Sequence, residues 1–340
     1  MMEWSDRHCR MFWRQLTREA VLYTEMVTTG AILHAGPERF LKFNEDEHPI
    51  ALQLGGSNPD DLARCAKIAE QWGYDEVNLN CGCPSDRVQN GMFGACLMAQ
   101  PLLVADCIKS MQDACNIPVT IKHRIGIDAM ESYDDMVSFV EPIQAVGCNT
   151  FIVHARKAWL QGLSPKQNRE IPPLQYEMVY QLKKDFPELE IIINGGITTI
   201  QESVDHLKAV DGVMVGRSAY HNPYILTEVD QLLYRDSGTA AQSQGNSENN
   251  CEVTIPKTRD QVLLDFIPYI EKQLEEGVAL NHITRHILGL FQSVPGAKRF
   301  RRHISQNAHK RGAGIEVVYQ ARELVQEAQH QVENYHAAIV

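Results

Sequence analysis

Seven polar side chains that could bind a substrate or move a proton occur at or just beyond the ends of short apolar runs. They are Gln53, Asn80, Cys83, Lys122, Arg124, His154 and Arg156. The runs before them are rich in β-branched residues, as buried parallel strands are. In a barrel of parallel strands the carboxyl ends meet at one mouth, where such enzymes keep their catalytic groups. One such residue alone is often structural, but their recurrence on successive strands indicates an active site.

Two glycine-rich segments follow the last two predicted strands. They are Asn194-Gly195-Gly196 and Gly216-Arg217. Backbone N–H groups beside glycine can approach phosphate oxygens, arginine adds a charge-assisted bond, and these loops are the usual phosphate site of a (β/α)8 barrel. Because no GxGxxG follows a strand, a Rossmann dinucleotide site is not predicted. A phosphorylated cofactor is therefore predicted, and Lys122 with Gln53 would suit flavin mononucleotide (FMN), whose reduced ring a nearby positive charge stabilises.

Two cysteines lie close together in the segment NLNCGCPSDRVQNGMFGACLM (78–98). Their C-x-C spacing differs from the C-x-x-C of zinc sites and redox disulfides, so no metal site is expected. Cys81 continues a strand and is interpreted as a packing residue. Cys83 lies on a Gly-Cys-Pro turn, where a thiol with an ordinary pKa of about 8.5 is protonated at neutral pH and can serve as a general acid.

The elements that must position these residues alternate between strand and helix, which predicts a parallel α/β fold. Strands are predicted at 21–26, 49–55, 76–81, 118–123, 150–155, 190–195 and 211–216, with helices at 58–73, 102–115, 132–147 and 199–208. A (β/α)8 TIM barrel closes with eight strands. Because a helical stretch at 6–17 begins almost at once, we expect an N-terminally truncated barrel whose first strand is missing or reduced to Met1 and Met2.

A second, all-helical domain is predicted at the C-terminus. We divide the chain into a catalytic barrel at 1–234, a Ser/Gly/Asn/Gln-rich flexible linker at 235–257 and a helical domain at 258–340, with helices at 258–277, 279–292, 297–309 and 315–336. The chain has a net charge of −11, but residues 256–340 hold 11 Lys and Arg against 9 Asp and Glu. Residues 298–311 carry six basic side chains and no acid. Either a solvated helix face or a phosphate-contacting strip fits this pattern.

Composition places the chain among ordinary globular proteins. No apolar run approaches the roughly 18 residues of a membrane span, and the N-terminus has no secretory signal, so a cytoplasmic protein without a membrane partner is expected. A plastid location stays open if a transit peptide precedes the present first residue. Nine cysteines, an odd count, favour reduced thiols over a disulfide framework. We further expect a monomer.

The motifs resemble those of the tRNA-dihydrouridine synthase family, most closely its A subgroup, which acts on uridines 20 and 20a. The resemblance spans nearly the whole chain apart from 235–257. It is carried by 78–98 and by MMEWSDRHCR, TEMVTTGAILH (24–34), QLGGSNP (53–59), IKHRIGID (121–128), VHARKAWLQGLSPKQNREIPPL (153–174), NGGI (194–197), VGRSAY (215–220) and GLFQSVPGAKRFRRHIS (289–305). Family members usually open with a strand ending in Ala-Pro before the Met-Met pair with which this chain begins.

The resemblance implies an FMN barrel with a helical RNA-binding domain that reduces D-loop uridines of tRNA to 5,6-dihydrouridine with NADPH as electron source. Hydride would pass from the flavin to uracil C6, and Cys83 would protonate C5. The implied cofactor contacts are Met1, Met2, Gln53, Lys122, His154, Asn194, Gly195, Gly196, Gly216 and Arg217. The implied substrate contacts are Asn80, Arg156, Lys166, Arg169, Lys298, Arg299, Arg301 and Arg302. The target uridine must be flipped out of the folded tRNA to reach the flavin.

Two alternatives remain open on the sequence. One is a flavin barrel that acts on a free pyrimidine, as dihydroorotate dehydrogenase does, although a free pyrimidine would not need the basic helical extension. The other is an inactive RNA-binding protein, against which the joint presence of Cys83, Lys122 and His154 argues.

Overall fold

The computed structural model describes residues 1–85, 91–234 and 256–337. These residues form two compact units. The barrel unit comprises residues 1–7 and 21–216, and the helical unit comprises residues 8–20 and those from 217 onward. Most of the predicted linker at 235–257 lies outside the described residues.

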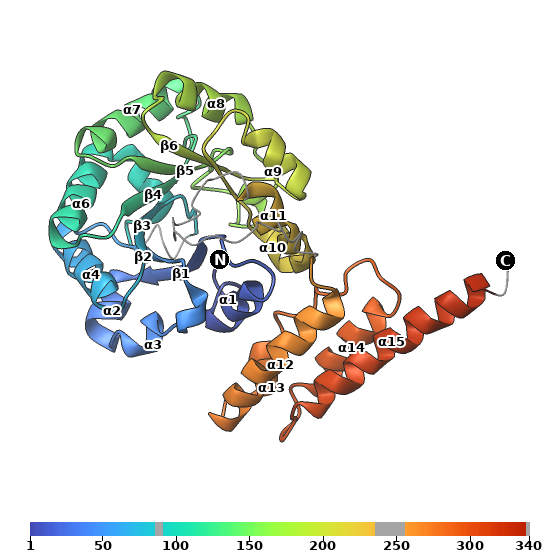
Figure 1. The fold of residues 1–340 in the computed structure, drawn as a ribbon. Helices are drawn as coiled ribbons and strands as arrows, with labels where there is room; N and C mark the ends of the chain where they lie inside the picture. Colours follow the sequence, from blue (N-terminus) through green and yellow to red (C-terminus); the bar gives the residue numbers. More distant parts are fainter. Residues whose placement is uncertain (86–90, 235–255, 338–340) are drawn as a thin grey trace, which may run out of the picture. The chain divides into compact units, whose positions relative to one another are not determined.

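The barrel unit is built on one sheet of seven parallel strands in chain order (Figure 1). The number of strands and their places agree with the prediction, and β1 and β7 form the two edges of the sheet. The strands are β1 (Leu22–Thr28), β2 (Ile50–Gly55), β3 (Glu76–Cys81), β4 (Val119–Arg124), β5 (Thr150–His154), β6 (Glu190–Asn194) and β7 (Gly212–Met214).

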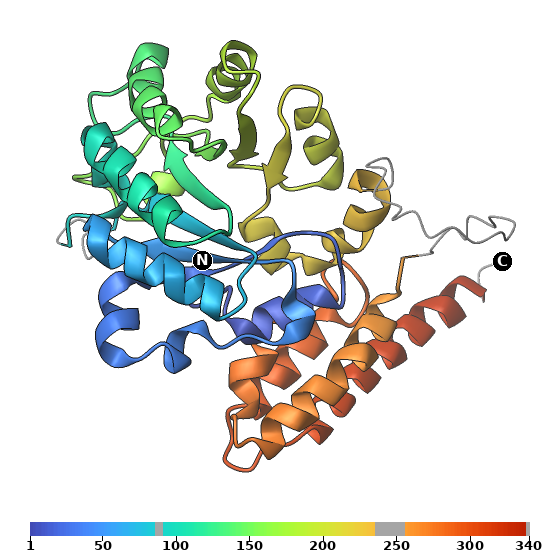
Figure 2. The same ribbon diagram turned by 60° about the vertical axis from the view of Figure 1, so that its left-hand side comes forward.

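Helices form an outer layer around these strands (Figures 1 and 2). Because helices cover one face and the barrel interior the other, central strands such as β2 are buried along their whole length. The connecting elements are α2 (Thr29–Ala35), α3 (Glu38–Leu41), η1 (Glu45–Glu47), α4 (Pro59–Gln71), η2 (Gly94–Ala99), α6 (Pro101–Ala114), α7 (Tyr133–Ala145), η3 (Gln167–Arg169), α8 (Tyr176–Asp185) and α9 (Ile200–His206). This alternation confirms the predicted TIM-barrel class.

Local sequence explains where the helices begin. The side chain of Asn58 accepts a hydrogen bond from the Asp61 N–H, and proline follows it in the first turn of α4. Ser132 and Asp135 form a capping box at the start of α7. Such caps satisfy backbone N–H groups that the helix cannot, so the loops from the strand ends enter each helix at a fixed residue.

The cysteines of the outer layer are packing residues. Burial raises the pKa of Cys65 on α4 and of Cys107 on α6 to about 12. These thiols are fully covered by the core between helices and sheet. The eight cysteines within the described residues are all free.

The helical unit consists of α1 (Arg7–Arg14), α10 (Arg217–His221), η4 (Pro223–Glu228), α11 (Val229–Leu233), α12 (Arg259–Glu275), α13 (Leu280–Thr284), α14 (Ala297–Asn307) and α15 (Glu316–Ala337). Its most N-terminal part is α1, which the sequence analysis assigned to the barrel. The Phe12 ring packs 5.3 Å from that of Phe266 on α12, and the Trp13 indole N–H donates to the Ala219 carbonyl at 3.0 Å. This apolar face explains why α1 and residues 217–234 group with the C-terminal helices rather than with the strands.

The second predicted C-terminal helix, 279–292, is shorter than expected. It ends at Thr284, after which consecutive i→i+3 turns run to residue 296. A Cβ on Gly289 would lie 2.4 Å from the His221 carbonyl oxygen. The backbones of Gly289 and His221 thus approach so closely that only glycine fits at position 289, where the chain follows i→i+3 turns in place of the expected helix. No helix in the described part of the chain is both long enough and apolar enough to span a membrane.

Candidate active site

The carboxyl ends of β2 to β6 bring the predicted polar residues onto one edge of the sheet. The parallel register places Asn80 opposite Lys122, and His154 opposite Asn194. Gln53 reaches Asn80, whose Nδ2 donates to Gln53 Oε1 at 2.8 Å. The structure therefore gathers these five residues, which are up to 141 positions apart in the sequence, at one mouth of the barrel.

The turn at 82–84 carries Cys83 and is held from both sides. Asn80 Oδ1 accepts from the backbone N–H groups of Gly82 and Cys83, each at 3.0 Å. Cys83 is half-buried with its Sγ 3.6 Å from Ser85 Oγ. Cys81, by contrast, is fully buried, and burial raises its pKa well above the ordinary value. Of this pair, Cys83 is thus the thiol placed for chemistry.

Arg124, which the sequence places at the end of a strand without a specific role, holds the other side of the turn. Its Nε donates to the Gly82 carbonyl at 2.8 Å, and its Nη1 donates to the carbonyls of Lys157 and Asn168 at 3.1 Å. Burial lowers the pKa of Arg124 to about 10, so it remains charged at neutral pH. The signal in the sequence was its place two residues after Lys122, on the same face of the strand. Arg124 ties the turn to the 157–168 loop.

Lys122 and Asn194 form a polar pair across the barrel interior. Lys122 Nζ donates to Asn194 Oδ1 at 3.0 Å, and Asn194 Nδ2 donates to the Met214 carbonyl at 2.8 Å. Burial, and secondarily the charge of Arg124, lower the pKa of Lys122 to about 7. A partly desolvated ammonium of this kind suits an anionic partner because it gains most from a neighbouring negative charge.

The loop after β6 requires both of its glycines. Gly195 has φ +120° and Gly196 has φ +75°. A Cβ at Gly195 would lie 2.7 Å from the His154 ring, and one at Gly196 would lie 2.5 Å from Leu174. Because neither glycine has a side chain, the backbone at 195–196 leaves open a space beside the His154 imidazole and the Lys122 ammonium. This space and its N–H groups fit a phosphorylated, planar cofactor. Gly216, after β7, lies beside the Met1 side chain, whereas Arg217 begins α10 of the helical unit.

The 156–175 loop is folded around Asn168, which sequence reasoning passed over. Asn168 is fully buried and bonds the backbone of Trp159 and Leu163 through its amide. Arg156 donates to the carbonyls of Glu170 and Pro172, so its guanidinium also braces this loop. At the short helix η3 of this loop, the N-cap residue Lys166 is exposed and Arg169 is half-buried.

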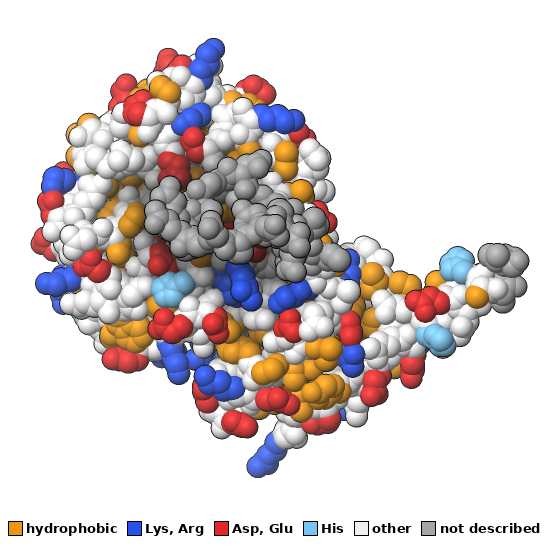
Figure 3. All heavy atoms as spheres, in the orientation of Figure 1, with side chains coloured by type: hydrophobic (Ala, Val, Ile, Leu, Met, Phe, Trp, Pro, Cys, Tyr) orange, Lys and Arg blue, Asp and Glu red, His pale blue; other side chains and the backbone are white. Residues whose placement is uncertain are grey.

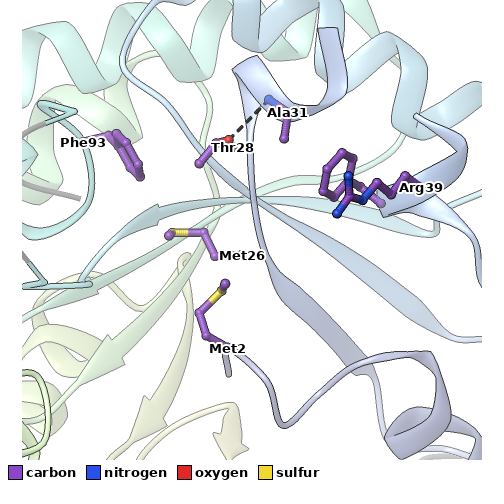
Figure 4. A pocket seen from close by; sticks show the side chains of 7 residues that line it. Met2, Met26, Thr28, Ala31, Arg39 and Phe93 are labelled. Carbon is purple, nitrogen blue, oxygen red and sulfur yellow. Dashed lines mark hydrogen bonds between the residues drawn. The ribbon is translucent and has the colours of Figure 1, made fainter. Parts of the chain in front are cut away.

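A cavity of about 380 Å³ opens beside the end of β1 (Figure 4). The side chains of Met2 and Met26 lie next to one another in it, between Phe93 and Arg39. Thr28 accepts a hydrogen bond from the Ala31 N–H at the start of α2. The lining is mainly apolar, with Arg39 as its one charged member among the described residues.

The predicted basic strip lies on α14 in the helical unit. Ala297, Phe300 and Ile304 form the buried face of this helix. Lys298, Arg299 and Arg302 are exposed, and the half-buried Arg301 donates to Gln292 Oε1 at 3.2 Å. On the face of the molecule in Figure 3, acidic and basic side chains are interspersed over the barrel helices. The described residues hold no group of three or more His, Cys, Asp or Glu that could bind a metal ion.

Comparison with known proteins gives consistent matches over the length of the chain. The model of the family "Dihydrouridine synthase (Dus)" matches residues 1–329. The tRNA-dihydrouridine(20/20a) synthase of Shewanella oneidensis is 58% identical over 96% of this chain and 92% of its own. The enzyme of the same name from Vibrio vulnificus is 57% identical over 94% of this chain and 94% of its own. The one from Pseudomonas aeruginosa is 56% identical over 96% of this chain and 93% of its own.

Among solved structures, morphinone reductase in complex with tetrahydroNAD superposes with a TM-score of 0.47 at 13% identity, covering 68% of this chain and 83% of that one. The family match and the identities above half of all aligned residues establish the relationship. The chain belongs to the dihydrouridine synthase family.

Proposed function

We propose that this chain reduces uridines 20 and 20a in the D-loop of tRNA to 5,6-dihydrouridine, with bound FMN and with NADPH as electron source. The observation that carries the proposal is the match to the family over residues 1–329, with relatives named for this reaction more than half identical to the chain. The mouth of the barrel supports it with a thiol after β3, an ammonium on β4 and a glycine cradle after β6.

The residues that would hold the cofactor are, apart from Arg217, all in the barrel unit. FMN, when bound, supplies the hydride that adds to C6 of uracil. Gln53, Lys122 and His154 would contact its ring system, with Met1 and Met2 at the edge. Its phosphate would be held by the backbone N–H groups of Gly195, Gly196 and Gly216 and by the side chains of Asn194 and Arg217.

Cys83 would deliver the proton that C5 requires. Its S–H bond breaks as the C5–H bond forms, and the thiolate left behind is reprotonated from solvent, which the half-buried position of Cys83 permits. Asn80 and Arg124 keep the 82–84 turn fixed while this occurs, because Asn80 Oδ1 accepts from the Gly82 and Cys83 N–H groups and Arg124 Nε donates to the Gly82 carbonyl. Such fixation supports proton transfer by holding the reacting atoms in range.

The tRNA would be held at two places. Asn80, Arg156, Lys166 and Arg169 would contact the flipped uridine and the nucleotides beside it. Lys298, Arg299, Arg301 and Arg302 of α14 would contact the phosphate backbone, and the absence of acidic residues from this helix supports that role.

We further propose a cytoplasmic monomer, or a plastid protein if a transit peptide precedes Met1. Gel filtration with and without tRNA would check the oligomeric state.

The test compares Cys83→Ala with Cys96→Ala. Cys96 is a second half-buried thiol, and its Sγ lies 3.1 Å from the Phe93 carbonyl. Both variants should bind FMN, seen as flavin absorbance of the purified protein. Cys83→Ala should lower the rate of dihydrouridine formation in tRNA by about 10²-fold or more, the usual contribution of a general acid, and Cys96→Ala should not.

Three results would contradict the proposal in different ways. Unchanged turnover in Cys83→Ala would remove its role as the acid. Reduction of free uridine or orotate at the rate of tRNA would favour a free pyrimidine as substrate. A colourless protein that binds tRNA and does not take up added FMN would favour a pure RNA-binding function.

A further inference from the structure

A line of hydrogen-bonded side chains runs inside the barrel from the start of β3 to the mouth. Thr120 Oγ1 donates to Glu76 Oε1 at 2.5 Å, and Asn78 Nδ2 donates to Thr120 Oγ1 at 2.8 Å. Gln53 Nε2 donates to Asn78 Oδ1 at 2.9 Å, and Asn80 Nδ2 donates to Gln53 Oε1 at 2.8 Å. The line is continuous and ends at the residue that binds the 82–84 turn.

The direction of every bond in the line is fixed by its two ends. At the mouth, Asn80 accepts from two backbone N–H groups, so the atom facing them must be its oxygen and its NH₂ must face Gln53. Gln53 must then turn its oxygen toward Asn80 and its NH₂ toward Asn78. At the other end, Tyr23 and Thr120 both donate to the Glu76 carboxyl group, which favours the same direction.

Beyond the half-buried Glu76, the line is closed to solvent. Asn78 is fully buried, and Thr120, Asn80 and Gln53 are 2%, 8% and 9% exposed. Water therefore cannot replace a bond that is lost, and a buried amide without a partner is costly. Burial also raises the pKa of Glu76, although its bonds to Thr120 and Tyr23 oppose this. The interior thus favours one arrangement of amides.

We propose that Asn78 is a positioning residue for the reaction: it supplies the buried partner that holds the Gln53 amide, and through it the Asn80 amide and the turn that carries Cys83, in this one arrangement. The inference rests on the proposed function for its meaning in catalysis. Asn78 itself bonds only Gln53 and Thr120 among the contacts described, so it acts through other residues.

The fixed direction has a chemical consequence at the mouth. Both lone pairs of Asn80 Oδ1 are occupied by the turn, and Nδ2 keeps one hydrogen. Toward a pyrimidine, Asn80 can therefore only donate, which matches a carbonyl oxygen of uracil and not an amino group. Gln53 keeps one N–H and one lone pair for the cofactor.

Two substitutions separate this role from simple packing. Asn78→Leu has a similar volume but accepts no hydrogen bond, so the buried Gln53 Nε2 loses its partner and the Gln53 amide is held only by its bond from Asn80. Asn78→Asp keeps an oxygen that accepts from Gln53 Nε2, so it preserves the direction of the Gln53 amide. Its second oxygen faces Thr120 Oγ1 and bonds it either by donating as a protonated carboxyl group or by accepting the hydrogen that Thr120 now gives to Glu76. Asp should therefore rescue what Leu loses.

Thr150→Val is the matched control. Thr150 Oγ1 donates to Glu190 Oε2 at 2.6 Å, the same hydroxyl-to-carboxylate bond as between Thr120 and Glu76, but on a neighbouring strand outside the line. Its loss should alter neither FMN binding nor Cys83. Thr120→Val, which removes the bond next to Asn78, should give a weaker form of the Leu phenotype and serves if Asn78→Leu does not fold.

The measurements are the rate of Cys83 alkylation by iodoacetamide, resolved by peptide mass spectrometry, the affinity of the apoprotein for FMN, and kcat and KM on tRNA. For Asn78→Leu we expect faster alkylation of Cys83 and at least threefold weaker FMN binding. We also expect kcat to fall about tenfold or more while KM changes much less, because a misplaced catalytic group slows the reaction without weakening substrate binding. Asn78→Asp should lie within about fivefold of the unsubstituted protein in kcat. In a Cys83→Ala background, Asn78→Leu should lower the residual rate much less than it does alone.

Equal losses in Asn78→Leu and Asn78→Asp would overturn the inference, because the direction of the amides would not matter. So would unchanged Cys83 alkylation and FMN affinity in folded Asn78→Leu, or Thr150→Val effects of the same size. The alkylation and FMN measurements do not need tRNA reduction, so they judge the positioning role even if the unsubstituted protein forms no dihydrouridine, a result that would count against the proposed function alone.

Discussion

Replacement of Arg124 by Met tests whether a buried guanidinium holds the turn that carries Cys83. The substitution removes three hydrogen bonds to the carbonyls of Gly82, Lys157 and Asn168 while keeping most of the side-chain volume. At about 2 kcal/mol for each bond to a charged group, the loss is about 6 kcal/mol. Burying the charge has a cost that offsets part of this, because the pKa of Arg124 falls from 12.5 to about 10, which corresponds to about 3 kcal/mol.

The net expectation is a loss of about 3 kcal/mol in the free energy of unfolding of the barrel unit. For a unit of this size that lowers the melting temperature by about 6–12 °C in differential scanning calorimetry. Since the pKa of about 10 lies well above neutrality, the loss should not change between pH 6 and pH 8. Hydrogen exchange should quicken at 82–84 and 157–168, and kcat should fall with little change in FMN content.

Arg64→Met provides the control. Arg64 is an exposed residue of α4 whose ion pair with Asp61 spans 3.6 Å, and such surface pairs contribute about 0–1 kcal/mol. An Arg124→Met protein with the melting temperature, exchange rates and kcat of Arg64→Met would refute the reasoning that Arg124 supports the turn.

Three further predictions concern charge. Lys122, with its pKa lowered to about 7, should be protonated below that pH and lose its charge above it. The affinity of the apoprotein for FMN, measured by fluorescence titration, should therefore weaken as pH rises through about 7. Lys122→Met should abolish that pH dependence. His123, buried between Phe139 and Phe151, has its pKa lowered from 6.5 to about 4 by burial. Its neutral form is therefore the stable one, and urea titrations should show that the protein loses about 3 kcal/mol more between pH 7 and pH 4 than His123→Phe does. Replacing Arg301 and Arg302 together with Ala should weaken tRNA binding and flatten its salt dependence by about 1–2 units of slope; equal affinity at every salt concentration would remove α14 from the tRNA site.

The strands of the barrel were predictable because each is a short β-branched run followed by a helix with its own cap. The residues at their ends could also be named in advance, since parallel strands put all their carboxyl ends at one mouth. Gln53, Asn80, Lys122 and Asn194 do meet there. The domain boundary was harder to place, because the apolar face of α1 has its partner on α12, more than 240 residues later in the chain.

What the sequence by itself determined is the class of fold and the set of chemical groups, because both follow from local periodicity and from residue types at strand ends. What only the tertiary structure decided is how those groups are held. The Arg124 guanidinium meets a carbonyl 42 residues away only through the register of β3 with β4. Asn78 meets Gln53 only through the register of β2 with β3. Side-chain hydrogen bonds between strands depend on which residues the register of the sheet places side by side. No local pattern in the chain specifies that register.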